Sequence, residues 1–195
     1  VVVNAAEAEG DVTISGIASG GDISEGDKVT FTLGETSYSA DVGAGGVWSV
    51  DVAGSDLTGG TAIDASVTST DDAGNSVTTT GSRDYGVDLE ATAGTLTINS
   101  IAGDDVVNAA EAEGDVTISG TAAGGDISEG DTVSFTLGET TYTTDIGAGG
   151  AWSVDVAGSD LTDGTSIDAS VESTDAAGNP VTSTATSTHT VDLGA

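Results

Sequence analysis

The chain contains two nearly identical copies of one sequence. Residues 2–16 return letter for letter at 106–120, and the similarity continues without a gap toward the C-terminus at an offset of 104 residues. A period of this size is too long for one coil of a solenoid and matches a small domain. We therefore expect two tandem domains, residues 1–90 and 91–195, each with a single modest core.

The first copy begins part-way through the repeat. The segment that corresponds to residues 95–103 of the second copy has no counterpart before Val1. We expect the first domain to lack its first strand, which would leave a sheet edge without a partner. We also expect the sequence to be an excerpt of a longer protein.

Alternation of apolar and polar residues dominates both copies and predicts short β-strands separated by turns rich in Gly, Asp and Asn. Seven strands are predicted in the complete second copy, at residues 95–101, 116–118, 133–137, 142–146, 151–156, 167–171 and 181–191. Residues 109–113 can form only one helical turn, and no segment has the periodicity of a longer helix. The fold class is therefore all-β: two tandem immunoglobulin-like Greek-key β-sandwiches arranged end to end.

The junction between the copies, residues 87–94, is short and contains no Gly/Ser-rich or Pro-rich tract. We expect it to limit the freedom of the two domains and to favour end-to-end stacking. Since a strand of about ten residues spans about 34 Å, each repeat should extend the array by roughly 40 Å.

Three aromatic positions recur in both copies and fall at alternating strand positions. This placement favours packing in the core over a ligand-binding aromatic cage. The residues are Trp48 and Trp152, Phe31 and Phe135, and Tyr38 and Tyr142.

The charge balance is strongly acidic. The chain has 33 acidic side chains against Lys28 and Arg83 alone, a formal net charge of −31. High charge with few apolar residues is often a sign of disorder, but here the apolar residues alternate regularly and recur in both copies. Such a surface attracts cations and repels nucleic acid and anionic membranes, so we expect neither as a partner. The lack of cysteine excludes disulfides and thiol catalysis, and no apolar run is long enough to insert into a membrane.

Acidic and Asn side chains gather in the predicted loops at the two ends of each sandwich. In a seven-strand tracing, loop 104–113 shares one end with the exit of the last strand, and loops 126–131 and 175–179 share the other. Stacked repeats would bring the two acidic ends face to face across the junction. The candidate metal ligands are Asn4, Glu7, Glu9, Asp88 and Glu90 in the first copy, and Asp104, Asp105, Asn108, Glu111, Asp126, Glu129, Asp131, Asp175 and Asp192 in the second.

Calcium is the cation that this donor set favours. Two carboxylates at 4 Å repel by about 1 kcal/mol even in water, so converging acids call for a counter-ion. Oxygen donors without cysteine, in flexible loops with many carboxylates, favour Ca²⁺ over Mg²⁺. The alternative is a solvated acidic surface that needs no metal. The chain has neither an EF-hand loop nor a Gly-Gly-x-Gly-x-Asp repeat, so no motif fixes the ligands.

His189 is the only histidine, and its counterpart in the first copy is Tyr85, so the two repeats cannot share a role for it. We expect His189 to be an exposed strand residue. We also expect the chain not to be an enzyme, because the loops of a small sandwich rarely form a cleft that perturbs the pKa of a carboxyl group.

The last strand offers an alternative function. Alternating threonines form a row that can present hydroxyls to a ligand, so a binding module for a sugar, ice or a protein, using the loops or this strand, stays open. Ordinary β-propensity explains the row better, and the first copy interrupts it. The row consists of Thr182, Thr184, Thr186, Thr188 and Thr190.

Four motifs and the junction together resemble a known family. They are Gly-Gly-Asp-Ile-Ser-Glu-Gly-Asp at 124–131, Trp-Ser-Val-Asp-Val at 152–156, Thr-Asp-Ala-Ala-Gly-Asn at 174–179, Thr-His-Thr-Val-Asp at 188–192 and Val-Asp-Leu-Glu-Ala-Thr-Ala-Gly at 87–94. Over its whole length the chain resembles the bacterial immunoglobulin-like extender repeats of giant repeats-in-toxin adhesins exported by type I secretion. It looks closest to those of large ice-binding adhesins. The junction and the repeat length are more specific than the 174–179 signature.

That resemblance implies Ca²⁺ bound within and between domains, which stiffens a stalk that projects a distal ligand-binding region from the cell. Carried over motif by motif, it adds Asp71 to the candidate ligands and singles out Asp175 and Asp88. It also implies an extracellular, cell-surface protein whose partners are the neighbouring repeats of the same monomeric chain. The first copy departs from the second at residues 83–86, so the last strands of the two repeats are not expected to pack identically.

Overall fold

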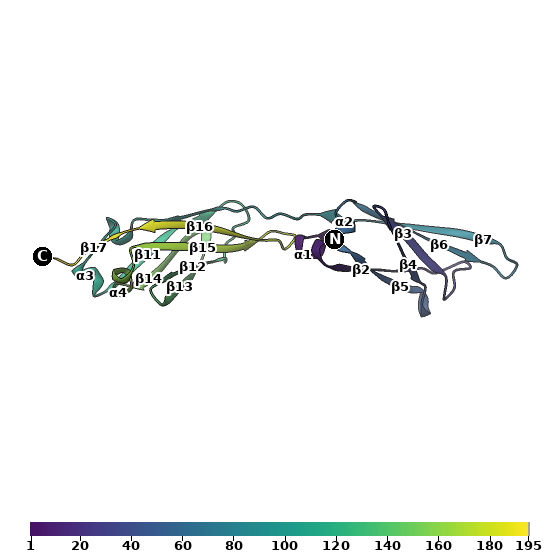
Figure 1. Cartoon of the computed structure of the whole chain (residues 1–195), viewed down its shortest axis with the longest axis horizontal. Helices are drawn as coiled ribbons and strands as arrows, with labels where there is room; N and C mark the ends of the chain where they lie inside the picture. The colour runs from purple at the N-terminus through teal and green to yellow at the C-terminus, as the bar shows by residue number, and fades with distance from the viewer. Residues whose placement is uncertain (195) are drawn as a thin grey trace. The chain divides into compact units, whose positions relative to one another are not determined.

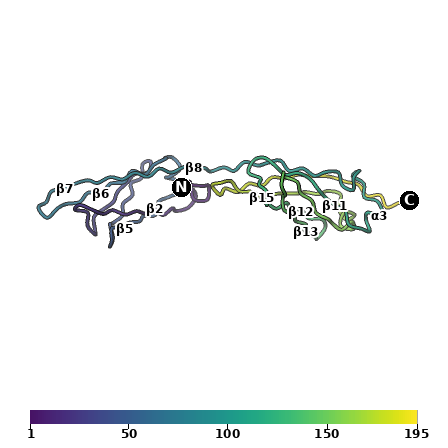
Figure 2. The backbone as a smooth tube through the Cα atoms, turned by 180° about the vertical axis from the view of Figure 1, so that it is seen from behind, coloured from purple at the N-terminus to yellow at the C-terminus, as the bar shows by residue number. Residues whose placement is uncertain are grey.

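The computed structural model describes residues 1–194 and divides the chain into two compact units, Val1–Glu90 (unit 1) and Ala91–Ala195 (unit 2). β-Strands dominate each unit, and the helices are very short (Figure 1; Figure 2 traces the same backbone from behind). The predicted all-β class is confirmed.

Unit 2 is a sandwich of two antiparallel sheets. One has the strand order β14-β11-β9 and the other β13-β12-β15-β16, while β10 and β17 form a separate parallel pair. The chain crosses between the sheets from β11 to β12, from β13 to β14 and from β14 to β15, which gives Greek-key connectivity. The elements are β9 (Thr95–Ile98), η2 (Ile101–Gly103), β10 (Val106–Asn108), α3 (Ala109–Ala112), β11 (Asp115–Ala123), β12 (Thr132–Leu137), β13 (Thr140–Asp145), η3 (Ala148–Gly150), β14 (Ala151–Ala157), α4 (Gly158–Asp163), β15 (Ser166–Thr174), β16 (Pro180–Thr188) and β17 (Thr190–Asp192).

Unit 1 repeats this plan with one difference. Its sheets have the orders β2-β5 and β4-β3-β6-β7, with β1 and β8 as the parallel pair, and no strand in the described part of unit 1 corresponds to β9. The elements are β1 (Val2–Val3), α1 (Ala5–Glu9), β2 (Asp11–Ile17), β3 (Lys28–Leu33), β4 (Thr36–Asp41), η1 (Ala44–Gly46), β5 (Val47–Ala53), α2 (Gly54–Leu57), β6 (Ala62–Thr70), β7 (Ser76–Asp84) and β8 (Gly86–Val87).

The prediction of seven strands in a complete copy is wrong, because unit 2 has nine strands among its described residues. β10 lies in a segment predicted as a loop, and the predicted last strand is interrupted at His189 into β16 and β17. Both changes have one cause, the parallel pairing of Val106 with Thr190 through Asn108 with Asp192. A short strand whose partner is far away in the sequence leaves no local pattern to detect.

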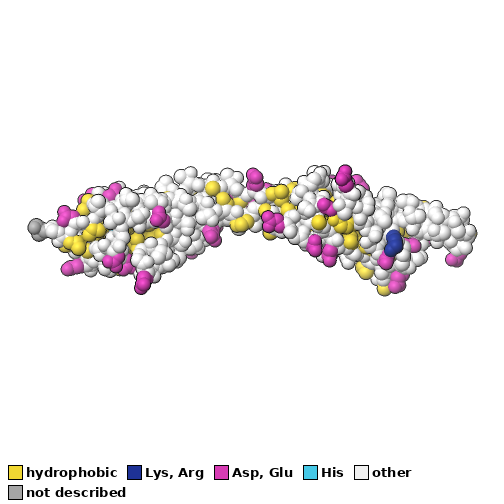
Figure 3. All heavy atoms as spheres, viewed as in Figure 1, with side chains coloured by type: hydrophobic (Ala, Val, Ile, Leu, Met, Phe, Trp, Pro, Cys, Tyr) yellow, Lys and Arg dark blue, Asp and Glu magenta, His cyan; other side chains and the backbone are white. Residues whose placement is uncertain are grey.

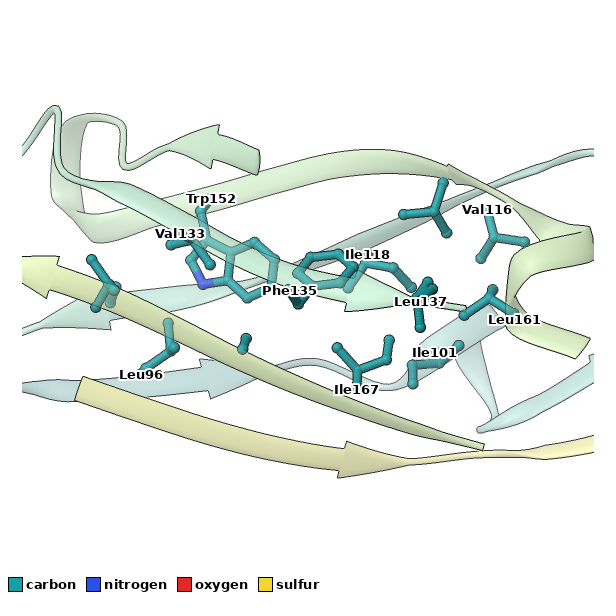
Figure 4. Close-up of a cluster of buried hydrophobic side chains, with 14 of the residues drawn as sticks. Leu96, Ile101, Val116, Ile118, Val133, Phe135, Leu137, Trp152, Leu161 and Ile167 are labelled. Atoms are coloured by element: carbon teal, nitrogen blue, oxygen red, sulfur yellow. The ribbon is translucent and has the colours of Figure 1, made fainter. Parts of the chain in front are cut away.

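The core of unit 2 lies between the two sheets, where alternate residues point inward (Figure 4). Phe135 lies at its centre, with its ring centroid 5.8 Å from that of Tyr142 and 6.4 Å from that of Trp152. Both Phe135 and Trp152 are buried, which confirms their predicted packing role. In unit 1 Phe31 is equally buried, but Trp48 is only half-buried.

The lack of a strand equivalent to β9 in unit 1 explains why Trp48 is less buried than Trp152. In unit 2, burial alternates along most of β16, whereas in unit 1 every residue of β7 is exposed. Both strands pair with their neighbour over nine residues in the same register, so the backbone arrangement is the same. As expected, the last strands of the two repeats do not pack identically.

Candidate metal-binding ends of the sandwiches

One end of unit 2 brings together several predicted ligands. The parallel β10–β17 pair places Asn108 opposite Asp192, and α3 follows directly with Glu111. Asp104 and Asp105 lie in the turn that leads into β10. In unit 1 the β1–β8 pair has the same register, and the Asp88 N–H donates to Val3 O (3.0 Å), which extends the pairing toward Asn4.

Asn108 and Glu111 form a capping box. Asn108 Oδ1 accepts hydrogen bonds from the N–H groups of Ala110 (2.9 Å) and Glu111 (3.1 Å), while Glu111 Oε2 accepts one from the Asn108 N–H (2.9 Å). The spacing Asn-x-x-Glu is the sequence signal for this motif. In unit 1, Asn4 and Glu7 repeat it at 2.9 and 3.0 Å. These side chains therefore cap and stabilise the one-turn helices α1 and α3.

The remaining acids at this end also shape the backbone. Asp105 has a positive φ of 63°, and its Oδ1 accepts the N–H of Ile101 (2.8 Å). Asp104 Oδ1 accepts the N–H of Val106 (3.1 Å), and Asp192 Oδ1 accepts the N–H of Gly194 (3.0 Å). Each carboxylate is held close to the main chain by a local turn.

In unit 1 the acids that follow β8 are exposed. The N–H of Glu90 donates to Asp88 Oδ1 (3.5 Å), and Glu9 lies at the C-terminus of α1 on the surface. These positions are accessible to a cation.

The opposite end of unit 2 holds the other group of predicted ligands. Asp126 exchanges two hydrogen bonds with Thr92: its Oδ2 accepts the Thr92 N–H (2.5 Å) and its N–H donates to Thr92 O (2.9 Å). Asp131 Oδ2 accepts the Ser128 N–H (2.8 Å), and Glu129 between them is exposed. Asp126 therefore anchors the start of unit 2 against the β11–β12 loop.

Asp175 builds the turn between β15 and β16. Its Oδ1 accepts the N–H groups of Ala177 (2.8 Å) and Asn179 (2.9 Å), and its Oδ2 accepts Asn179 Nδ2 (2.8 Å). The hydrogen bond from the Asn179 side chain is the main cause that lowers the pKa of Asp175. Asp71 and Asn75 repeat the arrangement in unit 1, and the pKa of Asp71 is lowered for the same reason. The Thr-Asp-x-Ala-Gly-Asn signature is thus a hairpin-turn motif, and calcium binding by its Asp stays a prediction.

No preformed metal cluster exists within the part of the chain that the structure describes. Nowhere in residues 1–194 do three or more Asp, Glu or His side chains approach closely enough to hold an ion. On the visible face, acidic side chains are scattered over the surface of both units (Figure 3). Several lie on strands, where Asp51, Asp155 and Asp168 accept hydrogen bonds from threonines on the neighbouring strand at 2.5–2.6 Å. The prediction that acidic side chains gather in loops therefore holds for some of them, whereas others lie on strands.

Sequence reasoning missed a Tyr–Asp pair that both units share. The Tyr142 hydroxyl donates to Asp160 Oδ2 (2.7 Å) and accepts the Ala157 N–H (3.2 Å). This hydrogen bond raises the pKa of Tyr142 and lowers that of Asp160. Tyr38 and Asp56 form the same contact at 2.6 Å. The identical spacing of 18 residues in both copies was the available signal.

The prediction that His189 is exposed is wrong: its side chain is buried. The chain turns inward between β16 and β17, which places His189 Nε2 2.9 Å from Leu161 O. Among residues 1–194, Nδ1 has no hydrogen-bond partner. In unit 1 the Tyr85 hydroxyl donates to Leu57 O (2.8 Å) from the equivalent position. A buried ring of this kind packs the core and offers no access to a substrate.

We expect His189→Ala to lower the free energy of unfolding of unit 2 by about 2–3 kcal/mol, since it removes a buried ring and leaves Leu161 O without its donor. His189→Tyr, which copies unit 1, should retain most of the stability. Urea unfolding followed by Trp152 fluorescence measures both. Equal losses for the two variants would contradict a hydrogen-bonded packing role.

No helix within residues 1–194 is long and apolar enough to cross a membrane.

Comparison with known proteins identifies close structural relatives, although no protein-family model and no curated protein sequence matches the chain. A structure of the Ca²⁺-stabilised adhesin that helps an Antarctic bacterium reach out and bind ice is 60% identical, with a TM-score of 0.96 over 100% of this chain and 47% of that one. A structure from a 1.5-MDa bacterial ice-binding adhesin, studied for its retention on the host cell surface, is 52% identical, with a TM-score of 0.95 over 99% of this chain and 61% of that one.

A third structure, a bacterial immunoglobulin-like domain from the M. primoryensis ice-binding adhesin, is 63% identical, with a TM-score of 0.51 over 52% of this chain and all of that one. The chain thus spans about half of the first relative and about three fifths of the second. The first two alignments cover 100% and 99% of this chain at identities of 60% and 52%. The chain belongs to the bacterial immunoglobulin-like extender repeats of large ice-binding adhesins.

Proposed function

We propose that the chain is a calcium-stabilised spacer of a bacterial surface adhesin, which projects a distal ligand-binding region away from the cell. The observation that carries this proposal is the 60% identity, over the whole chain, to a Ca²⁺-stabilised adhesin. The near-identity of the two copies supports it, because a spacer gains length by repetition, whereas a specific binding tip is usually single.

The residues that would hold calcium lie at the ends of the units. They supply only oxygen donors, which fit Ca²⁺. Asn108, Glu111 and Asp192 lie together at the β10–β17 end, and Asn4, Glu7 and Asp88 are their counterparts in unit 1. When bound, calcium supplies positive charge that offsets the repulsion between neighbouring carboxylates.

Location and partners follow from the same proposal. The chain acts outside the cell, at the surface, after type I secretion. Its partners are the neighbouring repeats of one monomeric polypeptide, and it has no catalytic role.

The rival function, a ligand-binding module, has one supporting feature. The threonine row on β16 is exposed from Thr182 to Thr188. Thr186 already donates its hydroxyl to Asp168 (2.6 Å), and β7 carries Ser82 and Asp84 where the row would continue. Only one of the two units presents the row, so the repeat does not carry this function.

Calcium should raise the stability of the chain. A ligand that binds only the folded state at a dissociation constant of about 0.1–1 mM stabilises it by about 1.4–2.7 kcal/mol per site at 10 mM. We expect thermal unfolding, followed by circular dichroism, to shift to higher temperature with Ca²⁺ and to return with chelator. A smaller shift with Mg²⁺ and with sodium chloride at equal ionic strength separates binding from screening.

Three charge-matched variants locate the site. Asp88→Asn and Asp192→Asn should reduce the calcium-dependent shift. Glu35→Gln removes the same charge from the exposed β3–β4 turn and should leave the shift unchanged. The same unfolding temperature in calcium and in chelator would contradict the proposal. If all three variants reduce the calcium-dependent shift equally, calcium acts only by screening the acidic surface.

A further inference from the structure

We propose that the Asp163–Gly164 peptide bond is a self-modification site, at which the folded chain converts Asp163 into isoaspartate through a cyclic succinimide. The Gly164 nitrogen attacks Cγ of Asp163, so that a C–N bond forms while the carboxyl hydroxyl leaves with the amide hydrogen as water. Water then opens the ring at either carbonyl, and opening at the former main-chain carbonyl leaves the backbone running through Cβ. One water is lost and one is regained, so the reaction needs no oxidant, reductant or cofactor.

The Asp–Gly pair is unique in the sequence. The chain has 30 glycines and 33 acidic residues, yet Asp is followed directly by Gly only at 163–164, and Asn is nowhere followed by Gly. A following glycine favours ring closure, because it lacks the Cβ that would crowd the attacking nitrogen and it leaves the backbone free to rotate. The equivalent positions in unit 1 are Gly59 and Gly60, so the first repeat cannot react there.

Asp163 lies where the backbone is little constrained. It is the exposed last residue of α4, and Gly164 leaves the helix in an extended conformation, with φ −146° and ψ 147°. A Cβ on Gly164 would meet no atom within 4 Å, so the space around the reacting bond is open. A negative side chain is unfavourable at the C-terminus of a helix, and Asp160 lies one turn before it, so the end of α4 opens readily.

Other residues that can form a succinimide are held by hydrogen bonds. Asn75 and Asn99 are each followed by the small residue Ser. However, Asn75 Nδ2 donates to Asp71 Oδ2 (2.9 Å), and Asn99 Nδ2 donates to Ser119 Oγ (3.1 Å). These bonds hold the two amide groups away from the next backbone nitrogen. Sequence and local structure therefore both single out 163–164.

An isoaspartate at 163 disturbs the contacts that hold His189. Leu161 packs in the core (Figure 4), and its carbonyl oxygen lies 2.9 Å from His189 Nε2. Thr165 O accepts the His189 N–H (3.0 Å). Residue 163 lies between these two acceptors, so an extra backbone carbon there moves one relative to the other. We therefore expect the modification to loosen unit 2 at the turn between β16 and β17 and to leave unit 1 unchanged.

The test ages the full folded chain at neutral pH and maps it with a protease that cuts before Asp but not before isoaspartate. We expect a peptide that is uncut at residue 163 to accumulate, preceded by a form that is one water lighter. Because helix ends open at little cost, the rate should lie within about 10-fold of that in a synthetic peptide of residues 160–167. The other Asp residues in the same digest are internal controls.

Two variants test the chemistry while preserving the fold. Gly164→Ala places a methyl group in open space and should slow the reaction by about 10-fold or more, because the Cβ crowds the nitrogen and restricts rotation. Asp163→Glu keeps the charge but requires a larger ring, so it should abolish the reaction. A rate below the tenfold range of the synthetic peptide, equal modification at other Asp residues, or an unchanged rate in Gly164→Ala would overturn the proposal.

Hydrogen exchange measures the effect on unit 2. After chromatographic separation, the His189 amide of the isomerised chain should exchange about 2- to 10-fold faster, which is the effect of weakening one hydrogen bond. The Tyr85 amide is the matched control in unit 1, where it donates to Thr61 O (2.9 Å), and its exchange should not change. Equal exchange of His189 in both forms, or faster exchange at both amides, would overturn the local effect on unit 2.

Discussion

Gly158→Ala is expected to lower the free energy of unfolding of unit 2 by about 3 kcal/mol or more, among the largest effects of any single methyl group in this chain. Gly158 is the first residue of α4 and is buried against the end of α3. A Cβ there would lie 1.9 Å from Glu111 O and 2.9 Å from Gly114 O. The Gly158 N–H also donates to Gly114 O (2.8 Å), so α4 cannot move away without losing that bond.

The chain provides its own control for this substitution. Gly164 ends the same helix, and a Cβ there would meet no atom within 4 Å. Gly164→Ala should change stability by no more than about 1 kcal/mol. Gly54→Ala repeats the clash in unit 1, at 1.8 Å from Glu7 O. Urea unfolding of the three variants measures the differences, and equal midpoints for the 158 and 164 variants would disprove the close approach of α3 and α4.

The two units are expected to unfold separately, with unit 1 the less stable by about 5 kcal/mol. β9 and the turn after it bring Leu96, Ile98 and Ile101 into the core of unit 2, and burial of each such side chain contributes about 1.5–3 kcal/mol. Unit 1 has no equivalent of these residues, and its core residues fall into two separate clusters. Denaturant should therefore produce two transitions.

Each unit contains one tryptophan, which allows the transitions to be assigned. In Trp48→Phe, fluorescence reports only unit 2, and in Trp152→Phe it reports only unit 1. We expect the Trp152→Phe chain to show the lower midpoint. The substitution in each case weakens only the unit that has become silent. A single transition at one midpoint in both variants would show that β9 adds no stability.

Much of the fold was predictable, because apolar and polar residues alternate along a strand that has one buried face. Leu96 in β9, and Val133 and Phe135 in β12, follow this pattern, and turn residues separate the strands. The β10–β17 pair was not predictable, since Val106–Asn108 is stabilised by a partner distant in the sequence. The inward turn of His189 was missed for the same reason: the interruption between β16 and β17 follows from that pairing and not from the local residues.

The candidate site was predictable only in part. The order of the predicted strands placed Asn108 and Asp192 at the same end of unit 2, and the structure pairs these two residues in the β10–β17 register. The roles of Asp175 and Asp105 in building turns could not be predicted. An acidic side chain in a loop can accept hydrogen bonds from backbone N–H groups as readily as it can bind a cation. Sequence alone does not reveal how many carboxylate oxygens remain accessible once these turns have formed.

Small-angle X-ray scattering of the full chain, first in calcium and then in excess chelator, tests the central claim most directly. A calcium-stiffened spacer should give a narrow distance distribution with a maximum near 80 Å, from two repeats of about 40 Å each. The distribution should broaden when calcium is removed, and Asp88→Asn should broaden it even in calcium. Profiles that do not change between calcium and chelator would contradict the account and leave the acidic ends as solvated surface.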